Sequence, residues 1–236
     1  MNIRMAIDGA CRRNGKENCV SSSGTFIEIF DNDTLVDTHV LSNFEIGSTN
    51  QRGELLALCS ALTYIKANAD SCHSSSIQIV TDSEYIYNAM TKEWYLGWES
   101  RGWLTASLNE VKNSDLWKSI KSLYEECKEL NAEIIFYHIK GHCIPFGKVT
   151  ANTLLSKEDS GKSLRQEVLR KYDSVMHSKK DILDKANELS LKNNGFKLEQ
   201  SILREFVVIN TIADAIATRC VDAADALMTQ AASNGS

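Results

Sequence analysis

Proline is almost absent from the 236-residue sequence, which holds only Pro145, and the sequence has neither a long hydrophobic run nor a CxxC pair. Helix and strand boundaries must therefore be read from glycine, asparagine, aspartate and hydrophobic periodicity. No apolar run approaches the roughly 18 residues that a membrane span requires. The first residues, MNIRMAIDGA, lack the hydrophobic core of a signal peptide, so we expect a cytoplasmic protein that does not engage a membrane.

The seven cysteines form an odd set without metal-binding spacing. A disulfide framework or a zinc site therefore has little support, and we expect reduced cysteines that serve as small core residues. His138 and His142 are four residues apart but run through Gly141, so no helix would hold both toward one metal. The formal net charge of −5 argues weakly against nucleic-acid binding by the whole surface but allows a local basic patch.

Hydrophobic periodicity predicts an α/β chain. Alternating or dense apolar residues predict five strands, at about 3–8, 25–30, 35–41, 77–81 and 133–139, with a hairpin between the second and third. Helical periodicity predicts helices at about 50–65 and 115–130. Three meandering strands followed by β-α units imply a five-stranded mixed sheet flanked by helices.

The segment 143–209 differs from the rest of the chain because nearly all of it has helical periodicity. It carries 12 Lys and Arg against 9 Asp and Glu, a net charge of +3, whereas the remainder has a net charge of −8. A final helix is predicted from about 211 to 228. We therefore predict a sheet domain made of 1–142 plus 210–228, a helical insert at 143–209, and a flexible tail at 229–236.

Four carboxylates stand where an α/β sheet gathers functional groups. Asp8 and Asp82 follow predicted strands, whereas Glu54 and Asp214 lie in the predicted first turns of helices. Strand ends and helix starts meet along one edge of such a sheet, so the four could converge. Crowded carboxylates repel one another unless a cation neutralises them, and Mg²⁺ prefers oxygen ligands. The alternative is that the two helical residues merely favour the helix dipole, while the two aspartates cap turns.

Six sequence tracts favour the metal site. They are AIDGACRRN at 6–14, STNQRGELLAL at 48–58, TDSEY at 81–85, GWESRGW at 97–103 continuing to VKNSDLW at 111–117, KGH at 140–142, and NTIAD at 210–214. Each resembles a motif of type 1 ribonuclease H, and they occur in that family's order. The resemblance covers 1–142 and 210–228, so chance convergence of all six is very improbable.

The resemblance implies a ribonuclease H-like five-stranded mixed sheet, in agreement with the periodicity, with 1–142 plus 210–228 as the catalytic domain. It implies metal-dependent endonucleolytic cleavage of the RNA strand of an RNA–DNA hybrid. Carried over by motif, Asp8, Glu54, Asp82 and Asp214 would hold two Mg²⁺ ions, with Mn²⁺ as an alternative. One ion would lower the pKa of an attacking water and the other would stabilise the leaving 3′-oxygen, giving 5′-phosphate and 3′-hydroxyl ends. His142 would assist proton transfer or product departure from a mobile loop.

The same resemblance implies a set of substrate contacts. These are Cys11, Asn14, Asn50 and Gln51 toward the minor groove of the hybrid, Thr49 and Arg52 toward a DNA-strand phosphate, Trp94 and Trp103 toward sugar or base surface, and Asn210. Minor-groove contacts to the 2′-hydroxyl are how a protein distinguishes RNA from DNA. Glu84 stands where the family more often has Gln, which weakens the contact expected there. We expect Trp98 and Trp117 to be core anchors instead.

Two departures from the family pattern concern nucleic-acid affinity. The tract Glu99-Ser100-Arg101 has little positive charge where related bacterial enzymes often carry a basic cluster, and the loop before Asn210 holds the 67-residue insert. Because phosphate contacts dominate affinity, we hypothesise that the insert is a small helical subdomain that clamps the hybrid. The candidate residues are Arg165, Arg170, Lys171, Lys179, Lys180 and Lys185. The alternative is a decorated loop that packs on itself or on a partner protein.

The alternative function is a catalytically silent module that binds hybrid or protein with the same fold. A silenced relative would typically have lost one carboxylate, and none is missing here. A related exonuclease or polynucleotidyl transferase is disfavoured by the TNQRGE tract and the Trp-rich segment. We further expect the protein to be a monomer.

Overall fold

The protein is described by a computed structural model that covers residues 1–16, 18–144, 160–176 and 180–234. Five strands form one mixed sheet in the order β3-β2-β1-β4-β5, which confirms the predicted sheet. The strands are β1 (Asn2–Arg12), β2 (Val20–Asp31), β3 (Thr34–Ile46), β4 (Ser76–Thr81) and β5 (Glu133–His138). The first three pair antiparallel, whereas β4 runs parallel to both β1 and β5.

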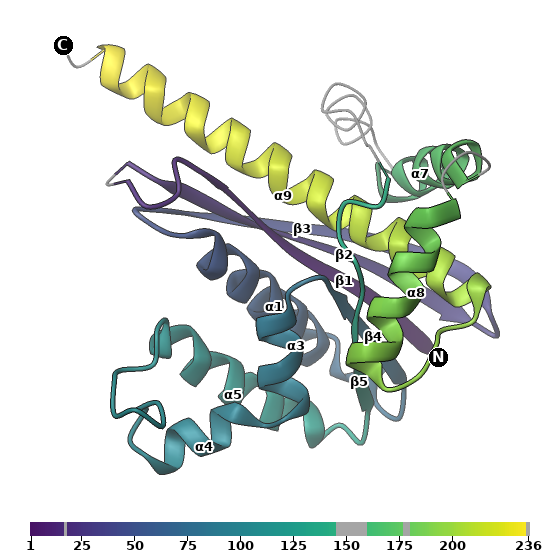
Figure 1. Cartoon of the computed structure of the whole chain (residues 1–236), viewed down its shortest axis with the longest axis horizontal. Helices are drawn as coiled ribbons and strands as arrows, with labels where there is room; N and C mark the ends of the chain where they lie inside the picture. The colour runs from purple at the N-terminus through teal and green to yellow at the C-terminus, as the bar shows by residue number, and fades with distance from the viewer. Residues whose placement is uncertain (17, 145–159, 177–179, 235–236) are drawn as a thin grey trace.

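Helices cover both faces of the sheet (Figure 1). Helix α1 (Asn50–Ala67) packs on one face, with α5 (Ser114–Lys128) against it. The short helices on this side are α2 (Ala69–Cys72), α3 (Glu84–Thr91) and α4 (Trp94–Ser100). The opposite face is crossed by the long helix α9 (Gln200–Asn234), beside α7 (Ser160–Met176) and α8 (Lys180–Asn194).

The alternation of side chains along β1 divides the core into two layers. Ile3, Met5 and Ile7 are buried in the cluster under α1. Ala6 points to the other face and lies in a second cluster with Phe26 and residues of α9. Because successive residues of a strand face opposite sides, Asp8 shares the α9 face with Ala6.

Helix α9 corrects the predicted boundaries at the end of the chain. It is one helix of 35 residues from Gln200 to Asn234, whereas we predicted a helix from 211 to 228 and a flexible tail from 229. No glycine or proline interrupts this stretch, so nothing in the backbone ends the helix at either predicted position. The last part of the insert and the segment that carries Asp214 are therefore one continuous rod.

The described part of the insert does not have a core of its own. Leu164, Val168 and Tyr172 of α7 and Ala186 of α8 are buried in the same cluster as Phe26 of the sheet. This finding contradicts the picture of a separate helical subdomain, because the apolar faces of α7 and α8 are closed by the sheet and α9. The predicted helices within 145–159 and 177–179 lie outside the described residues, and the division at 143–209 stays a prediction.

All seven cysteines are free thiols, and Cys19, Cys72, Cys127 and Cys143 are buried. Over the described ranges, no helix has the length and apolar character to cross a membrane.

Candidate active site

Strand pairing places Asp8 beside Asp82. The parallel pairing of β1 with β4 ends with Ile7 opposite Thr81. Asp8 follows Ile7 in the chain and Asp82 follows Thr81, so the two aspartates are neighbours. We predicted that Asp8 stands at the end of a strand. This was wrong, because β1 continues to Arg12 along β2. Only 7% of Asp8 is exposed, and its Oδ1 accepts a hydrogen bond of 2.7 Å from the backbone N–H of Gly9.

Asp214 reaches the same region through a close approach of α9 to the sheet. Gly24 of β2 is the cross-strand partner of Asp8. A Cβ atom at Gly24 would lie 2.2 Å from the carbonyl oxygen of Ala213, so only glycine allows the helix this close. Asp214, the residue after Ala213, lies in the middle of α9 and not in its first turn, which removes the helix-dipole explanation for it.

Glu54 approaches from the α1 side past another glycine. A Cβ atom at Gly9 would lie 2.4 Å from the backbone nitrogen of Glu54. Glu54 is the fifth residue of α1, and the first turn of that helix contains no acidic residue, so our placement of Glu54 in the first turn was wrong. Its Oε2 accepts a 2.6 Å hydrogen bond from the hydroxyl of Ser83, and its Oε1 accepts a 3.1 Å bond from Asn50 Nδ2.

The four carboxylates lie close enough for their charges to act on one another. Burial raises the pKa of Asp8 well above its ordinary value, and the negative charges of the other three raise it further. Burial and the charge of Asp214 raise the pKa of Asp82, although the nearby His142 lowers it. Burial and the charge of Asp82 likewise raise the pKa of Glu54, while the Ser83 hydrogen bond lowers it. The site therefore binds protons, or another cation, more tightly than isolated carboxylates do.

The donor set suits a hard divalent cation. Four carboxylates supply only oxygen ligands and excess negative charge, which is the chemistry that Mg²⁺ prefers. Within the described residues, no three His, Cys, Asp or Glu side chains are grouped closely enough to hold an ion as they stand. Mutual repulsion favours such a separation, so an ion would have to draw the carboxylates inward.

His142 lies at the open side of this group. Its side chain is 77% exposed, and its Nδ1 is 3.6 Å from Oδ2 of Asp214. The backbone of His142 is left-handed, with φ of 54°, and this turn directs the chain away from β5. The position suits a proton carrier with access to solvent, as the resemblance implied.

The predicted minor-groove residues gather between β1 and the start of α1. The backbone N–H of Asn50 donates to Asn14 Oδ1 at 3.4 Å, and Asn113 Nδ2 donates to Gln51 Oε1 at 3.3 Å. Cys11 lies in the same group, with its Sγ 2.7 Å from Sγ of Cys19. Burial is the main cause that raises the pKa of Cys11 to about 12, so this residue is a neutral thiol.

The predicted phosphate contacts are engaged within the protein. The Thr49 hydroxyl accepts the backbone N–H of Arg52 as the N-cap of α1. The Arg52 guanidinium donates to both oxygens of Glu45 and both oxygens of Asp115, at 2.7–2.9 Å. These two carboxylates raise the pKa of Arg52 and neutralise its charge, so a phosphate would have to compete with them.

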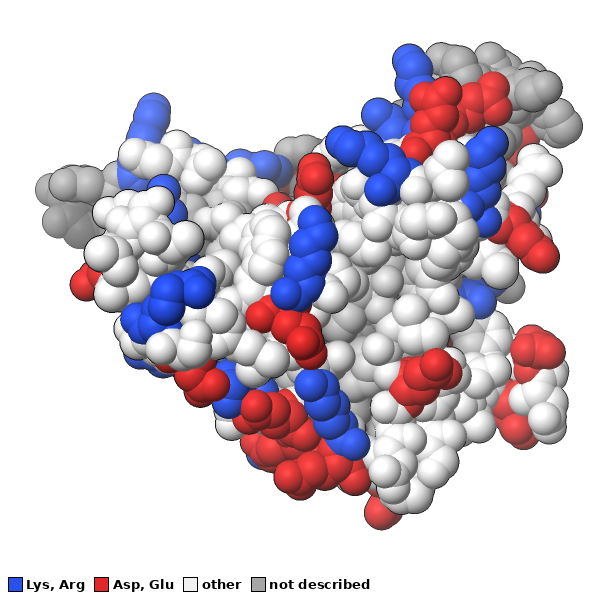
Figure 2. Space-filling view, turned by 60° about the horizontal axis from the view of Figure 1, so that its bottom comes forward, with Lys and Arg blue, Asp and Glu red and all other residues white. Residues whose placement is uncertain are grey.

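The Trp-rich segment separates into core and surface residues. Trp117 is fully buried and Trp98 is 9% exposed, which confirms both as core anchors. Trp94 is 36% exposed, and Lys118 Nζ lies 5.5 Å above the half-buried ring of Trp103. The rings of Trp94 and Trp103 therefore remain available to a ligand. Figure 2 shows that Lys and Arg on the visible face are interspersed with Asp and Glu and form no continuous basic field.

Asn210 does not have the accessibility that a substrate contact requires. It is 2% exposed, and its side-chain oxygen is buried without a hydrogen-bond partner. It lies on α9 four residues before Asp214, one helical turn away. The structure therefore contradicts direct substrate contact by this side chain as it stands.

The clamp candidates of the insert have different surroundings. Arg165 is bound internally to Glu28 and Glu205, so our assignment of this residue to hybrid binding was wrong. Arg170 pairs with Glu167 at 2.7 Å, and the charge of Lys171 acts on the same glutamate. Lys179 and the side chain of Lys180 lie outside the described residues.

Lys185 lies at a different site from the other candidates. It lines an open pocket of about 320 Å³ with Lys140, Lys192, Glu188 and Leu189. Lys140 is two residues before His142, so this pocket begins beside the candidate active site.

Sequence reasoning missed the residues that support the aspartates. Ser83, next to Asp82, bonds Glu54. His138 was considered only as a metal ligand, but its Nε2 lies 3.0 Å from the backbone oxygen of Asp82. The insert residues Asn193 and Asn194 bond His138. The sequence Asn193-Asn194-Gly195 is typical of a helix end and could have been noticed, but that its asparagines bond His138 follows only from the tertiary fold.

Comparison with known proteins connects this geometry to a family. The family model for RNase H matches residues 2–157, a segment that contains Asp8, Glu54, Asp82 and His142 and ends before Asp214. The Ribonuclease H of Clostridium botulinum (strain Hall) is 31% identical over 135 residues, which cover 57% of this chain and 80% of that protein. The Ribonuclease H of Polynucleobacter asymbioticus is 32% identical over 153 residues, covering 64% and 84%. Among solved structures, the foamy viral protease-reverse transcriptase in complex with dsDNA matches 68% of this chain and 90% of that one, with a TM-score of 0.46 and 21% identity.

Proposed function

This chain belongs to the ribonuclease H family, and from that premise we propose that it cleaves the RNA strand of RNA–DNA hybrids at internal positions. The observation that carries the proposal is that Asp8, Glu54, Asp82 and Asp214 come from four separate segments and lie close enough for the charges of the other three to act on Asp8. Their mutual repulsion is costly for folding unless a cation or a reaction makes use of it. A silent binding module would have no need for this arrangement.

The four carboxylates are the proposed ligands of two Mg²⁺ ions, with Mn²⁺ as a substitute. When bound, the ions would activate a water for in-line attack and stabilise the leaving 3′-oxygen, giving 5′-phosphate and 3′-hydroxyl ends. The chain itself supplies orientation: Ser83 and Asn50 fix the two oxygens of Glu54. His142, exposed and beside Asp214, would carry a proton between the site and solvent.

Substrate selection is proposed to occur at the surface formed by Asn14, Asn50 and Gln51. Asn50 and Gln51 lie on α1, which also carries Glu54, and Asn14 lies in the turn just after β1, the strand that carries Asp8. Amide groups can hydrogen-bond the RNA 2′-hydroxyl, and this contact would select a hybrid over duplex DNA.

The experiment that tests the proposal uses a hybrid whose RNA strand carries a label at one end. The protein is incubated with this hybrid and Mg²⁺ or Mn²⁺, with Asp8→Asn and Asp82→Asn variants as controls and duplex DNA of the same sequence as a second substrate. We expect internal cuts in the RNA strand of the hybrid, with 5′-phosphate ends. Neither variant should make these cuts, and duplex DNA should not be cleaved. Binding of hybrid without cutting would instead establish the silent module.

We also propose that Lys185 and Lys192 of α8, together with Lys140 after β5, extend the hybrid-binding surface. These three lysines surround one pocket beside the catalytic loop, and clustered lysines bind phosphate by charge. Deletion of the insert would not test this idea, because its apolar residues are part of the shared core. A Lys185→Glu, Lys192→Glu double variant should raise KM for hybrid and flatten its salt dependence, with kcat unchanged. An unchanged KM and salt slope would favour the protein-binding alternative for the insert.

A further inference from the structure

Strand β5 is the edge of the sheet next to the candidate active site, and its last residue is His138. In the register of β4 and β5, His138 pairs with Thr81, the residue before Asp82. The backbone N–H of the next residue, Ile139, donates to the carbonyl oxygen of Thr81 at 3.0 Å. On its outer side, the backbone of His138 has no neighbouring strand in the part of the chain that the structure describes. An edge of this kind leaves peptide groups without partners unless another element covers it.

Helix α8 of the insert covers this edge with one side chain. Asn194, the last residue of the helix, accepts the backbone N–H of His138 on Oδ1 at 3.0 Å. Its Nδ2 donates to the carbonyl oxygen of His138, also at 3.0 Å. The amide of Asn194 thus takes the place of a peptide group from a sixth strand. Gly195 follows with φ of +78°, the conformation that ends a helix.

The neighbouring Asn193 binds the imidazole ring. Its Nδ2 lies 2.6 Å from His138 Nδ1, so the amide donates and Nδ1 accepts. The ring hydrogen is then on Nε2, which points to the backbone oxygen of Asp82 at 3.0 Å. Only 3% of His138 is exposed. The ring is therefore a buried connector with a defined hydrogen-bond direction, from Asn193 through His138 to Asp82.

A second contact ties the other flank of the same turn to α8. The Tyr87 hydroxyl donates to the carbonyl oxygen of Asn193 at 2.8 Å, and Tyr87 lies on α3, which begins directly after Asp82-Ser83. The ring of Tyr87 also packs against His138, with centroids 5.7 Å apart. The end of α8 thus holds both elements that flank the turn bearing Asp82, namely β5 and α3.

We propose that Asn193 and Asn194 of the insert are positioning residues for the active site, which act through His138 to fix the turn that presents Asp82. The insert then takes part in catalysis without touching the substrate or the reacting atoms. This inference rests on the proposed function, because its kinetic consequence is measured on hybrid cleavage. Groups that orient the ligands of a metal typically change metal affinity or activity by about 10- to 100-fold when they are removed.

The kinetic test uses Asn193→Leu, which keeps the side-chain size but removes the donor. We expect kcat for hybrid cleavage to fall by about 10-fold or more, with KM nearly unchanged because the turn does not grip the substrate. His138→Leu should have the same effect, and His138→Gln should restore part of the activity because its amide can still donate to Asp82. Once His138→Leu is present, adding Asn193→Leu should cause no further loss. Leu191→Ala, at an exposed leucine of the same helix, is the matched control.

A spectroscopic measurement on the full chain keeps the inference independent of activity and of variant stability. The ¹⁵N chemical shifts of the His138 ring should report the Nε2–H tautomer in the wild-type protein and a mixture in Asn193→Leu. A wild-type ring protonated on Nδ1 alone would overturn the proposal. So would a wild-type enzyme that cuts hybrid while both leucine variants keep full kcat. A wild-type protein that does not cut hybrid, with the Nε2–H tautomer intact, would refute the proposed function and not the positioning contact.

Discussion

Two clusters of charged side chains, one around Arg4 and one around Asp8, differ in how their carboxylates are neutralised. In β1, Arg4 and Asp8 are both on the α9 side, about 13 Å apart along the strand. Around Arg4, the carboxylates of Glu28 and Glu205 are matched by two guanidinium groups, those of Arg4 and Arg165. Around Asp8, the four carboxylates have no arginine or lysine partner in the described contacts.

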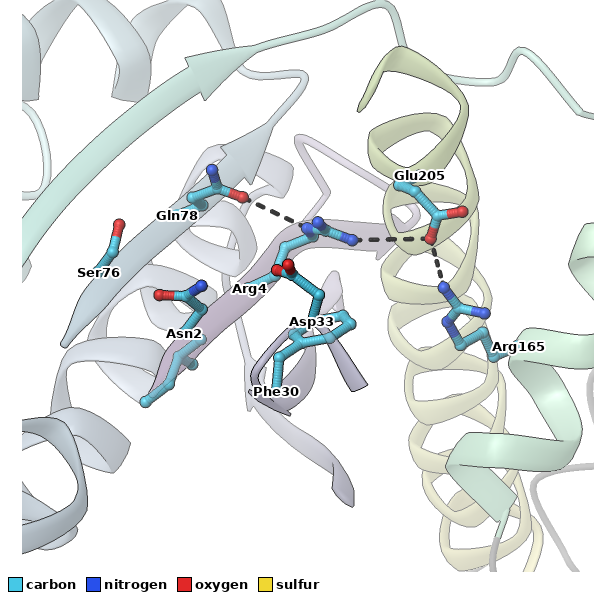
Figure 3. Close-up of a pocket in the computed structure, with 9 residues that line it drawn as sticks. Asn2, Arg4, Phe30, Asp33, Ser76, Gln78, Arg165 and Glu205 are labelled. Carbon is cyan, nitrogen blue, oxygen red and sulfur yellow. Dashed lines mark hydrogen bonds and ion pairs between the residues drawn. The ribbon is translucent and has the colours of Figure 1, made fainter. Parts of the chain in front are cut away.

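The first cluster is a structural one (Figure 3). Arg4 of β1, Glu205 of α9 and Arg165 of α7 face one another across a pocket of about 440 Å³. Glu28 is fully buried, and burial raises its pKa although both arginines lower it. Its charge is thus neutralised by residues of the chain. The carboxylates of the second cluster have no such partner in the described contacts, and buried charges left unpaired in this way are typical of a functional site.

The largest expected effect is on activity and comes from the cluster around Asp8, whose carboxylates have no arginine or lysine partner in the described contacts. Asp8→Asn should reduce hybrid cleavage by roughly 10³-fold or more, because it removes the most buried ligand oxygen. The same change should raise the free energy of unfolding of the ion-free protein, since it removes repulsion. Kinetics and urea denaturation measure the two effects.

In the cluster around Arg4, the opposite result is expected. Glu28→Gln should lower the free energy of unfolding and leave hybrid cleavage unchanged. Equal behaviour of the two variants would erase the distinction between the clusters.

A smaller effect is expected from the structural cluster, on stability alone. Arg165→Met leaves the buried Glu28 with one guanidinium partner instead of two. Removal of one member of a buried ion pair costs about 3 kcal/mol, so the urea midpoint should fall clearly. The kcat of the folded protein should not change, because Arg165 pairs with Glu28, the cross-strand neighbour of Arg4, and Arg4 lies about 13 Å along β1 from Asp8. An unaltered free energy of unfolding would show that Arg4 alone neutralises Glu28.

The two clusters also mark the limit of what the sequence could predict. The five strands were predictable because the alternation of apolar residues is a local signal. The order of the motifs predicted the four carboxylates, whose role as metal ligands stays a prediction. The network of Arg165 was not, since it joins residues 137 positions apart in sequence; a positive charge on a predicted helix reads as solvated or ligand-binding. The course of α9 was also missed, because a family-based boundary was placed inside a stretch that has no helix breaker.

The same limit applies to the support of the site. Gly9 follows Asp8 and Gly24 pairs with Asp8 across the strands, but only the packed structure shows that these glycines make room for Glu54 and for α9. The importance of His138 depends on Asn193, 55 residues later. Contacts of this kind carry no periodicity and no motif.

A moderate effect is expected from pH and Mg²⁺ on the second cluster. The pKa values of Asp8, Glu54 and Asp82 are raised by folding, so the folded state holds protons more tightly than the unfolded state. The contribution of these three carboxyls to the stability of the ion-free protein should therefore be greatest below the ordinary carboxyl values of 3.8–4.5 and should fall as pH rises toward and through the raised values. Saturating Mg²⁺ should reverse this loss, by about 2.7 kcal/mol at 100 times its Kd.

Thermal melts with and without Mg²⁺, at about pH 4 and about pH 7.5, measure this effect. The shift in Tm should be large at the higher pH and small at the lower, where the ligands are protonated. Asp8→Asn should reduce it, whereas Arg165→Met should keep it. A shift that is independent of pH, or one that survives in Asp8→Asn, would place the cation elsewhere.

The smallest expected effect comes from an ion pair on the same helix as Arg165. Arg170 pairs with Glu167 three residues earlier, but its side chain is 70% exposed, so solvent and salt already screen its charge. Arg170→Met should therefore leave the urea midpoint unchanged within the error of the measurement, although it removes the same functional group from α7 as Arg165→Met does. Because the substitution and the helix are matched, any difference in stability between the two variants reports the burial of Arg165 and the loss of one of the two guanidinium partners of Glu28. If both variants lost equal stability, the loss would come from changing any arginine of α7. The cluster around Arg4 would then not be stabilised by the pairing of Arg165 with Glu28.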